Sequence, residues 1–484
     1  YGIMTGNNVS TVRAVVMFFA MVYSNVAEKT YDIASASALA AIVSLLDAPL
    51  LLFNCSFLLS YLAIIGIAYI FPAIKNIFEY NSKLLDGFIA SLSIQLAALP
   101  VNLFYFFKIQ LLSVFVNVAV IPMMTVVMIS AIVSGIICFI SPGIGKLTIG
   151  AAVYSLKFFE ILCGICSKIP SSVWTPGRPS GANIVIYYLV ILIFLMQPFK
   201  KKRIWNIGII IPSIAAVSIR LHFYFEMTFI DVGQGDGIYM ETPEGTTVLI
   251  DGGSSDNKKL YEYTLEPFLL SKGRKKLDAV IVTHCDNDHI SGIRKIFTED
   301  NIKVKTLYMP STTMTDEVYT ELIELAAESG TDIKYIYEGY SMTEKDFYMY
   351  CLHPEYEYDT SERNDYSTTL YIRYDNFSAL LTGDISGEVE SNILQKYKDF
   401  PQVTILKAAH HGSRFSNTED FIEEFAPQNI VISCGKDNSY GHPHRETIER
   451  FENKGIPWLT TMENGAITVI VNKNNTEINT YLDK

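Results

Sequence analysis

Histidine is absent from the first 220 residues, and acidic side chains are scarce there. All eight histidines of this 484-residue chain lie at or after His222, which excludes imidazole-based chemistry from the first part. That part holds 14 Lys and Arg against 6 Asp and Glu, which leaves 24 of the 38 basic and 44 of the 50 acidic side chains for residues 221–484. The resulting net charges of +8 and −20 indicate two parts in different surroundings. Together with the 50% apolar content, they exclude a single soluble domain, a disordered chain and a collagen-like fibre.

Three further features are missing. The seven cysteines are odd in number and scattered, so we expect unpaired thiols rather than a disulfide framework. No phosphate-binding Gly-x-x-x-x-Gly-Lys-Ser/Thr loop occurs, so any energy for transport must come from another protein. The first residue is Tyr1 rather than Met, and we expect a fragment whose upstream part is missing.

Long apolar runs fill the first part. A bilayer span needs about 20 apolar residues, and we predict about eight spans. They are residues 12–26, 33–53, 57–74, 85–107, 111–140, 147–166, 182–196 and 204–219. The run 111–140 is long enough to contain a break at Pro122 or Gly135. Because one span suffices to anchor a protein, eight packed spans favour a pore or transporter over residues 1–220.

The positive charges predict how the chain crosses the membrane. Lys200, Lys201, Lys202 and Arg203 lie between the last two predicted spans. Short loops rich in Lys and Arg stay in the cytoplasm, so the final span then carries residues 221–484 to the extracytoplasmic side.

Residues 221–484 show short alternating apolar runs between helical stretches, which predicts an α/β domain. The predicted strands are residues 223–230, 237–241, 246–250, 279–283, 371–374, 379–381, 404–406 and 430–433, and the predicted helices are residues 316–329, 386–398 and 446–454. About 260 residues suffice to bury a full core.

The segment Thr283-His284-Cys285-Asp286-Asn287-Asp288-His289 directly follows an apolar strand. Four potential ligands within six residues of a strand-exit loop can converge on two adjacent metal ions. Further ligand types stand at the ends of predicted strands, namely His353, Asp384 and the pair His410 and His411. A carboxylate such as Asp384 can bridge two cations. His442 and His444 either contact a substrate or belong to a turn.

These residues resemble a known family. His284-x-Asp286-x-Asp288-His289, Asp251, His353, Asp384 and His410-His411-Gly412-Ser413 resemble, in order, the motifs of the metallo-β-lactamase superfamily. The runs Asp231-Val232-Gly233-Gln234-Gly235-Asp236 and Gly441-His442-Pro443-His444 narrow the resemblance to the ComEC-type competence proteins of bacterial DNA uptake. Residues 12–14 and 57–62 are similar to the membrane domain of that family. The resemblance implies an αββα metallo-β-lactamase sandwich over residues 221–484 behind a membrane channel domain.

The resemblance also implies roles for single residues. His284, Asp286 and His353 would hold one divalent metal ion, Asp288 and His289 the other, and Asp384 would bridge them. His411 would complete the ligands, since the superfamily's last His commonly precedes Gly or Ser. Asp288, His410, His442 and His444 would serve catalysis, while Asp231, Gln234, Asp236 and Asp251 would support the metal loop. The superfamily has His where this chain has Asp286, and this harder oxygen ligand makes Mn²⁺ or Mg²⁺ plausible beside Zn²⁺.

The implied function is uptake of transforming DNA across the bacterial cytoplasmic membrane, with hydrolysis of the strand that is not transported. Expected partners are DNA, membrane lipid, a DNA receptor, a cytoplasmic ATPase or helicase and further copies of the chain. One alternative is a membrane-bound phosphodiesterase acting on lipid or cell-wall substrates such as phosphorylcholine, and another is a transporter with a regulatory soluble domain. The charge of −20 opposes DNA binding, so a local basic track is needed, for which residues 258–259, 272–276 and Arg414 are candidates.

Overall fold

The structure, a computed structural model, describes residues 8–78, 82–169, 172–198, 204–220, 222–299, 301–398, 400–473 and 475–482. The chain divides into two compact units. The first comprises residues 1–220 and Leu270–Gly273, and the second comprises Leu221–Leu269 and Arg274–Lys484.

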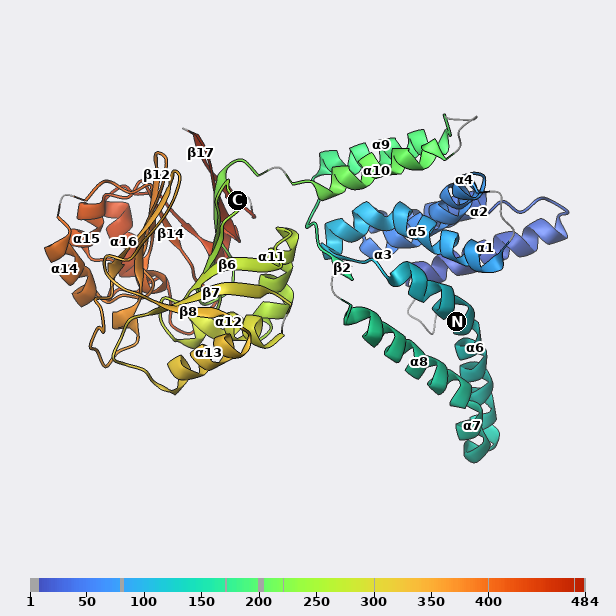
Figure 1. Ribbon diagram of the computed structural model, residues 1–484, viewed down its shortest axis with the longest axis horizontal. Coiled ribbons are helices and arrows are strands. Elements are labelled where there is room, and N and C mark those ends of the chain that lie inside the picture. The colour runs from blue at the N-terminus through green and yellow to red at the C-terminus, as the bar shows by residue number, and fades with distance from the viewer. Residues whose placement is uncertain are drawn as a thin grey trace. The chain divides into compact units, whose positions relative to one another are not determined.

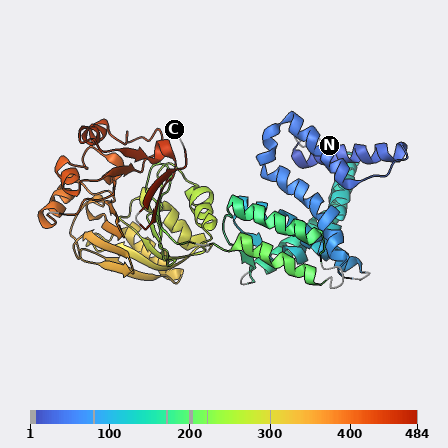
Figure 2. The same ribbon diagram turned by 90° about the horizontal axis from the view of Figure 1, so that it is seen from above.

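The first unit is helical. Its helices are α1 (Val9–Val26), α2 (Ile33–Asp47), α3 (Cys55–Ile65), α4 (Phe71–Lys75), α5 (Lys83–Phe106), α6 (Ser113–Ile140), α7 (Pro142–Thr148), α8 (Gly150–Ser167), α9 (Gly181–Leu195) and α10 (Trp205–Ser218). Two short strands, β1 (Ile109–Gln110) and β2 (Val173–Trp174), pair antiparallel. Helices α9 and α10 lie side by side in both views (Figure 1, Figure 2).

Five helical stretches of the described residues are long and apolar enough to cross a membrane. They are Val9–Val26, Cys55–Lys75, Lys83–Phe106, Ser113–Ile140 and Pro142–Ser167. The number of about eight spans therefore stays a prediction, since three further apolar helices of the described residues are shorter. Helices α2, α9 and α10 lie where spans were predicted but have only 15, 15 and 14 residues, which at about 1.5 Å per residue falls short of a hydrocarbon core of about 30 Å.

Helix α6 is continuous through Pro122, so the break considered for this run does not occur. The cluster of residues 200–203 lies outside the described residues. The predicted orientation of the chain thus stays a prediction.

A proline inside α5 shows how this unit satisfies its backbone. Pro100 has no N–H, which leaves the carbonyl oxygen of Leu96 without its helical donor. The hydroxyl of Tyr187 on α9 donates to that oxygen at 2.6 Å, and Tyr188 donates to the carbonyl of Ala97 at 3.1 Å. Neighbouring side chains commonly replace such lost bonds where water is excluded. The backbone beside Pro100 therefore also connects α5 to α9 by hydrogen bonds.

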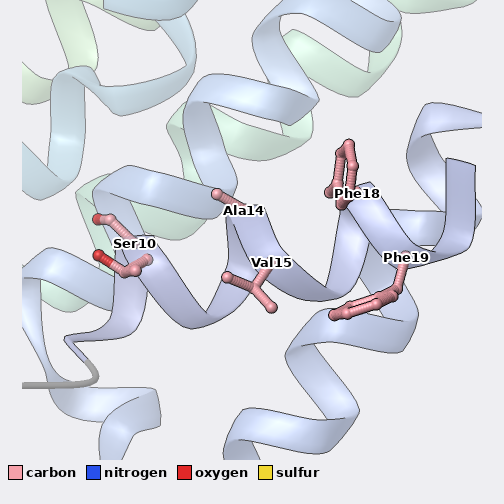
Figure 3. A pocket seen from close by; sticks show the side chains of 6 residues that line it. Ser10, Ala14, Val15, Phe18 and Phe19 are labelled. Atoms are coloured by element: carbon pink, nitrogen blue, oxygen red, sulfur yellow. The ribbon is translucent and has the colours of Figure 1, made fainter. Parts of the chain in front are cut away.

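Helix α1 presents apolar side chains to its surroundings. A shallow pocket on it is lined by Ser10, Thr11, Ala14, Val15, Phe18 and Phe19. Figure 3 shows the rings of Phe18 and Phe19 projecting from the helix, and they are 56% and 65% exposed. A solvent-facing helix would carry polar side chains there, so this surface suits lipid.

The second unit contains two sheets. From edge to edge, the first has β17 (Asn475–Thr480), β16 (Ile467–Asn472), β3 (Phe225–Phe229), β4 (Ile238–Glu241), β5 (Thr247–Ile250), β6 (Lys276–Ile281), β7 (Lys303–Pro310) and β8 (Asp332–Ile336). The second has β15 (Trp458–Thr460), β14 (Asn429–Ile432), β13 (Ile405–Lys407), β12 (Phe377–Leu381), β11 (Thr369–Tyr374), β10 (Phe347–His353) and β9 (Ser341–Glu344).

Helices cover the outer faces of both sheets, which gives the predicted αββα sandwich (Figure 1). They are α11 (Glu266–Ser271), α12 (Asn287–Glu299) and α13 (Glu317–Glu328) on the first sheet, α14 (Gly387–Lys396), α15 (Glu419–Phe425) and α16 (Arg445–Asn453) on the second, and the short α17 (Thr461–Asn464). Strands β5 to β8 are parallel to one another, as are β12 to β15.

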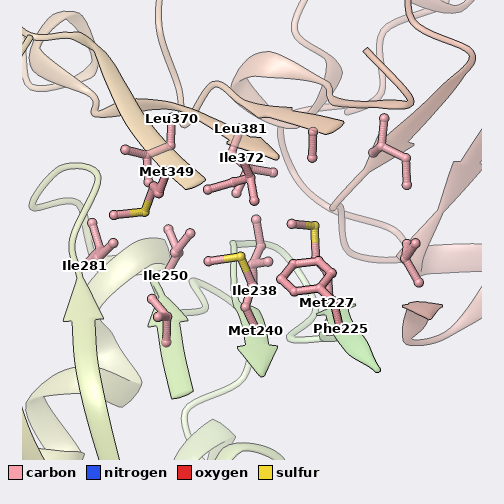
Figure 4. Close-up of a cluster of buried hydrophobic side chains, with 14 of the residues drawn as sticks. Phe225, Met227, Ile238, Met240, Ile250, Ile281, Met349, Leu370, Ile372 and Leu381 are labelled. Carbon is pink, nitrogen blue, oxygen red and sulfur yellow. The ribbon is translucent and has the colours of Figure 1, made fainter. Parts of the chain in front are cut away.

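The core lies between the sheets. Phe225, Met227 and Ile250 of the first sheet face Met349 and Leu381 of the second, all fully buried (Figure 4). Such sheets pack about 10 Å apart with interleaved side chains. Because this core packs the two sheets against each other, it also positions the loops that follow their strands.

Candidate metal centre

The candidate site lies where parallel strands of both sheets end. β5 leads into Asp251 and β6 leads into His284, while β12 leads into Asp384 and β13 into His411. The carboxyl ends of parallel strands share one edge of a sheet, and ligand sites form there. Each sheet therefore contributes part of the site.

Five of the predicted ligands come together in the described structure. Nε2 of His289 lies 3.3 Å from Oδ2 of Asp384, and Nε2 of His411 lies 3.2 Å from the same oxygen. Nε2 of His411 is also 3.5 Å from Oδ2 of Asp288, and the rings of His284 and His289 are 4.0 Å apart. Two overlapping groups, each with donor atoms within 4.8 Å of one another, are His284, His289 and Asp384, and Asp288, His289 and His411.

The outer hydrogen bonds of the histidines fix which nitrogen faces the centre. Nδ1 of His289 lies 2.8 Å from Oδ2 of Asp251, and Nδ1 of His411 lies 2.9 Å from the carbonyl oxygen of Ser433. Both partners can only accept, so each Nδ1 carries the proton. Nδ1 of His284 is 3.0 Å from Oγ of Ser367. The Nε2 atoms of His289 and His411 are then left with a lone pair for a metal, as metal-binding histidines require.

These nitrogens fit a divalent cation. Nε2 of His284, His289 and His411 and Oδ1 of Asp384 are buried and have no hydrogen-bond partner among the described residues. A buried polar atom without a partner is costly, and three imidazoles with a carboxylate match the ligand preferences of Zn²⁺ or Mn²⁺. The described residues can therefore hold a metal ion, of which Asp288, His289, Asp384 and His411 form the most complete set of ligands.

Opposite charges hold this cluster together. Burial by itself raises the pKa of Asp384, but His411 and His289 hold it well below its usual range. Burial lowers the pKa of His411, but Asp384 and Asp288 raise it to about 10. A bound cation would take the place of the protons on these imidazoles.

Lys407 was not predicted from the sequence, yet it lies at the base of the site and is 1% exposed. Its ammonium forms an ion pair with Asp236 and lies 3.7 Å from Oδ1 of Asp384. It also donates to the carbonyl of Gly383 at 3.1 Å. Lys407 thereby supplies an internal positive charge beneath the candidate metal position.

Residues predicted to support the metal loop do contact it. Oδ1 and Oδ2 of Asp251 accept from the backbone N–H and the hydroxyl of Thr283 at 2.8 and 2.7 Å. The backbone N–H of Asp236 donates to the carbonyl of Asp288 at 3.0 Å. At Gly235, φ is +152° and a Cβ would lie 2.4 Å from the carbonyl oxygen of Asp288, so only glycine allows this approach.

The other two residues of the same loop lie further from the centre. Asp231 accepts from the backbone N–H of Gly233 at 3.2 Å. Oε1 of Gln234 accepts from the backbone N–H of Gly435 at 3.2 Å, which ties the loop to the segment after β14.

His353 does not join the cluster. Its Nε2 donates to the carbonyl of Asp365 at 2.6 Å and so offers no lone pair to a metal. β11 lies between β10 and β12, which separates His353 from Asp384 by two strand spacings of about 4.8 Å each. The assignment of His353 as a ligand therefore finds no support in this geometry, and His353 instead holds the loop of residues 354–368.

Asp286 is engaged by an arginine. Its Oδ1 lies 2.9 Å from Nη1 of Arg363, and its Oδ2 lies 3.6 Å from Nε2 of His284. Burial raises the pKa of Asp286, but His284 and Arg363 hold it below its usual range. Arg363 and Ser367, both in the loop of residues 354–368, were missed because polar loops carry no periodic signal.

The remaining histidines surround the mouth of the site. His410 is 31% exposed on its side chain, and its Nε2 lies 4.0 Å from Oδ2 of Asp384. Its ring is 5.4 Å from that of His442, and burial lowers the pKa of His442 to about 4. Nδ1 of His444 accepts from the backbone N–H of Arg414 at 3.1 Å, so His444 helps to form the turn.

Comparison with known proteins agrees with the two-part chain. Residues 1–201 match the family model of competence proteins, and residues 230–320 match the metallo-β-lactamase superfamily. Over 96% of its length the chain is 29% identical to ComE operon protein 3 of Bacillus subtilis, of which it covers 62%. Over 81% of its length it is 23% identical to Recombination protein 2 of Haemophilus influenzae, of which it covers 47%.

The chain thus spans less than two thirds of these relatives. Among solved structures, the metallo-β-lactamase fold protein YhfI from Bacillus subtilis is 14% identical with a TM-score of 0.33, and the match covers 49% of this chain and 95% of that one. Residues 1–201 are accordingly similar to the competence family, and residues 230–320 within the second unit are similar to the metallo-β-lactamase superfamily.

Proposed function

We propose that the chain takes part in DNA uptake across the bacterial cytoplasmic membrane, and that residues 221–484 hydrolyse phosphodiester bonds of the strand that is not transported. The observation that carries the proposal is the convergence of three unpartnered imidazole nitrogens on Asp384. This cluster shares a chain with a competence-family domain that has five candidate membrane helices. Residues 1–220 would form the channel.

The chain's own residues divide the work at the site. Asp288, His289, His411 and Asp384 would hold the cation, and Asp251 and Ser433 keep two of the imidazoles in the tautomer that could bind it. When bound, divalent cations lower the pKa of a water molecule and stabilise the charge that develops on phosphate.

His410 and His442 would receive the substrate at the mouth. Burial lowers the pKa of both rings, so they are neutral at pH 7. A neutral imidazole has one N–H to donate to a phosphate oxygen and one nitrogen to accept. His442 retains a buried Nδ1 without a partner, which suits such a contact.

The net negative charge of the second unit opposes the binding of DNA. Residues 221–484 carry −20, and binding a polyanion depends on neutralising its phosphates. Of the candidate basic residues, Arg414 lies next to the site, because its backbone N–H donates to His444. Its guanidinium already lies 3.3 Å from Glu446, so a phosphate would have to displace that partner.

The test is cleavage of linear DNA by the purified full chain with Mn²⁺ or Zn²⁺. We expect cleavage by the wild type and none by Asp384→Ala. If the wild type leaves DNA intact with every metal but hydrolyses small phosphodiesters such as a phosphorylcholine ester, the substrate is a lipid or cell-wall component instead. Cleavage that survives Asp384→Ala would show that the chemistry lies elsewhere.

The arrangement in the membrane belongs to the same proposal. Residues 221–484 would face the extracytoplasmic side, with a DNA receptor there and an ATPase or helicase in the cytoplasm. A tag after Lys484 should be accessible to protease in intact cells. Protection of the tag would reverse the predicted orientation.

A further inference from the structure

The loop of residues 354–368 brings a guanidinium to the rim of the metal centre. Nη1 of Arg363 lies 2.9 Å from Oδ1 of Asp286, and its Nε lies 2.8 Å from Oδ2 of Asp316. Asp316 in turn caps helix α13, since its Oδ1 accepts from the backbone N–H of Tyr319 at 2.9 Å. Arg363 is therefore held in place from two sides.

The donors around the centre are distributed unequally. One position has Asp288, His289, His411 and Oδ2 of Asp384 at its disposal. A second position beside it would depend on His284 and Asp286, whose Nε2 and Oδ2 atoms are 3.6 Å apart.

Beyond His289 and Asp384, which this second position would share with the first, the neighbouring described side chains have other partners. Oδ1 of Asp384 faces Lys407 at 3.7 Å. The hydroxyl of Ser367 lies 3.0 Å from Nδ1 of His284 and accepts from the backbone N–H of Asp384 at 3.1 Å. Nε2 of His353 donates to the carbonyl of Asp365. Among the described residues, Asp286 is thus the only carboxylate that the second position would not share, and Arg363 pairs with its Oδ1.

We propose that Arg363 is a positioning residue that makes the two cation positions unequal, so that the second fills only when the guanidinium leaves Asp286. A guanidinium bonded to a carboxylate competes for its lone pairs, and its charge repels a divalent cation a few ångströms away. The proposal rests on the metal dependence of the proposed function and not on its DNA substrate.

The experiment is a titration of the metal-free full chain in detergent with Mn²⁺, followed by electron paramagnetic resonance. An isolated Mn²⁺ and a spin-coupled pair give different spectra, so the two positions are counted separately and without DNA. For the wild type we expect one tight Mn²⁺ and a second at least about tenfold weaker. For Arg363→Gln we expect the second site to tighten about 10-fold to 100-fold, the range seen when partners of metal ligands change.

Two further variants test whether the effect is specific to the guanidinium of Arg363. Arg363→Lys keeps the charge but cannot span Asp286 and Asp316 in the same way, so it should tighten the second site by a smaller factor. Arg294→Gln is the matched control, because Arg294 on α12 pairs with Glu321 on α13 at 2.7 Å. The two metal sites of this variant should match those of the wild type.

Two outcomes would overturn the proposal. One is binding of two Mn²⁺ ions with equal affinity by the wild type. The other is an unchanged second site in both Arg363→Gln and Arg363→Lys. If the Mn²⁺ affinities are as expected but the wild type does not cleave DNA, the result counts against the nuclease assignment and not against the role of Arg363.

Discussion

The Nδ1–H of His411 donates to the carbonyl oxygen of Ser433 at 2.9 Å, while the neighbouring His410 points its Nε2 to within only 4.0 Å of Asp384. The two histidines are adjacent in sequence, but φ values of 53° and 49° turn their side chains in different directions. The pair is thereby divided into a buried residue at the centre and a half-buried one at its mouth.

The first prediction separates these two roles. His411→Ala should lower the affinity for Mn²⁺ at least about 10-fold to 100-fold, because it removes a ligand rather than a partner of one. His410→Ala should keep the metal and lose about 10²-fold or more in turnover, as for a residue that assists proton transfer or charge stabilisation. Metal content after dialysis and rates of DNA cleavage measure both. Equal metal loss in the two variants would contradict the division.

The second prediction concerns Asp251, which contacts Thr283 and the outer nitrogen of His289. In Asp251→Asn one oxygen becomes an NH₂ group, which cannot accept from the N–H of His289. We expect about 10-fold to 100-fold weaker Mn²⁺ binding with little change in the circular dichroism spectrum. Wild-type affinity would show that Asp251 does not orient His289.

The third prediction is a charge-balance test at Lys407, whose ammonium pairs with Asp236 in the buried base of the site. Lys407→Met should lower the free energy of unfolding by about 3–5 kcal/mol, because Asp236 is left as an unpaired buried charge. Adding Asp236→Asn should restore most of this loss. Pulse proteolysis in urea of the metal-free chain reads the folded fraction of the second unit. A double variant no more stable than Lys407→Met would refute the pairing as the cause.

The fourth prediction is a pH dependence at His353. Burial lowers its pKa to about 4, whereas an unfolded His titrates near about 6.5. Between these values the unfolded state binds more protons, so the free energy of unfolding should fall by about 1.4 kcal/mol per pH unit as the pH drops. His353→Gln keeps a side-chain N–H donor but does not titrate, and it should flatten this slope.

Urea midpoints measure this slope through the fluorescence of Trp458, after Trp174 and Trp205 are replaced by Phe. The triple variant with His353→Gln is compared with the double Trp variant from pH 7 to pH 4.5. An identical slope in the two proteins would assign the titration to another group.

Much of the second unit follows from sequence patterns. The helix predicted at residues 316–329 occurs as Glu317–Glu328 with Asp316 as its cap, and the strand predicted at residues 246–250 occurs as Thr247–Ile250. Alternation and capping are local properties, so a sequence displays them. The metal loop was recognisable for the same reason, since its ligands lie within six residues.

What the sequence could not show depends on contacts between distant segments. Lys407 ends an apolar strand, and only the fold reveals that its partner is Asp236 in the loop between β3 and β4 of the other sheet. Arg363 lies in a polar loop whose path is decided by the anchoring of His353 to Asp365. In the first unit, apolarity located all eight helical runs, but hydropathy did not reveal that three of them are short.

The division of the ligands between the two sheets gives the cation a mechanical role. Asp288 and His289 follow a strand of the first sheet, and Asp384 and His411 follow strands of the second. Neither sheet alone supplies all of these ligands. A bound ion would therefore connect the two sheets and oppose their separation. By mass action, cation at 100 times its dissociation constant would add about 2.7 kcal/mol to the stability of the closed sandwich. A chelator should therefore lower the free energy of unfolding of the second unit, in addition to removing the ion from the proposed site.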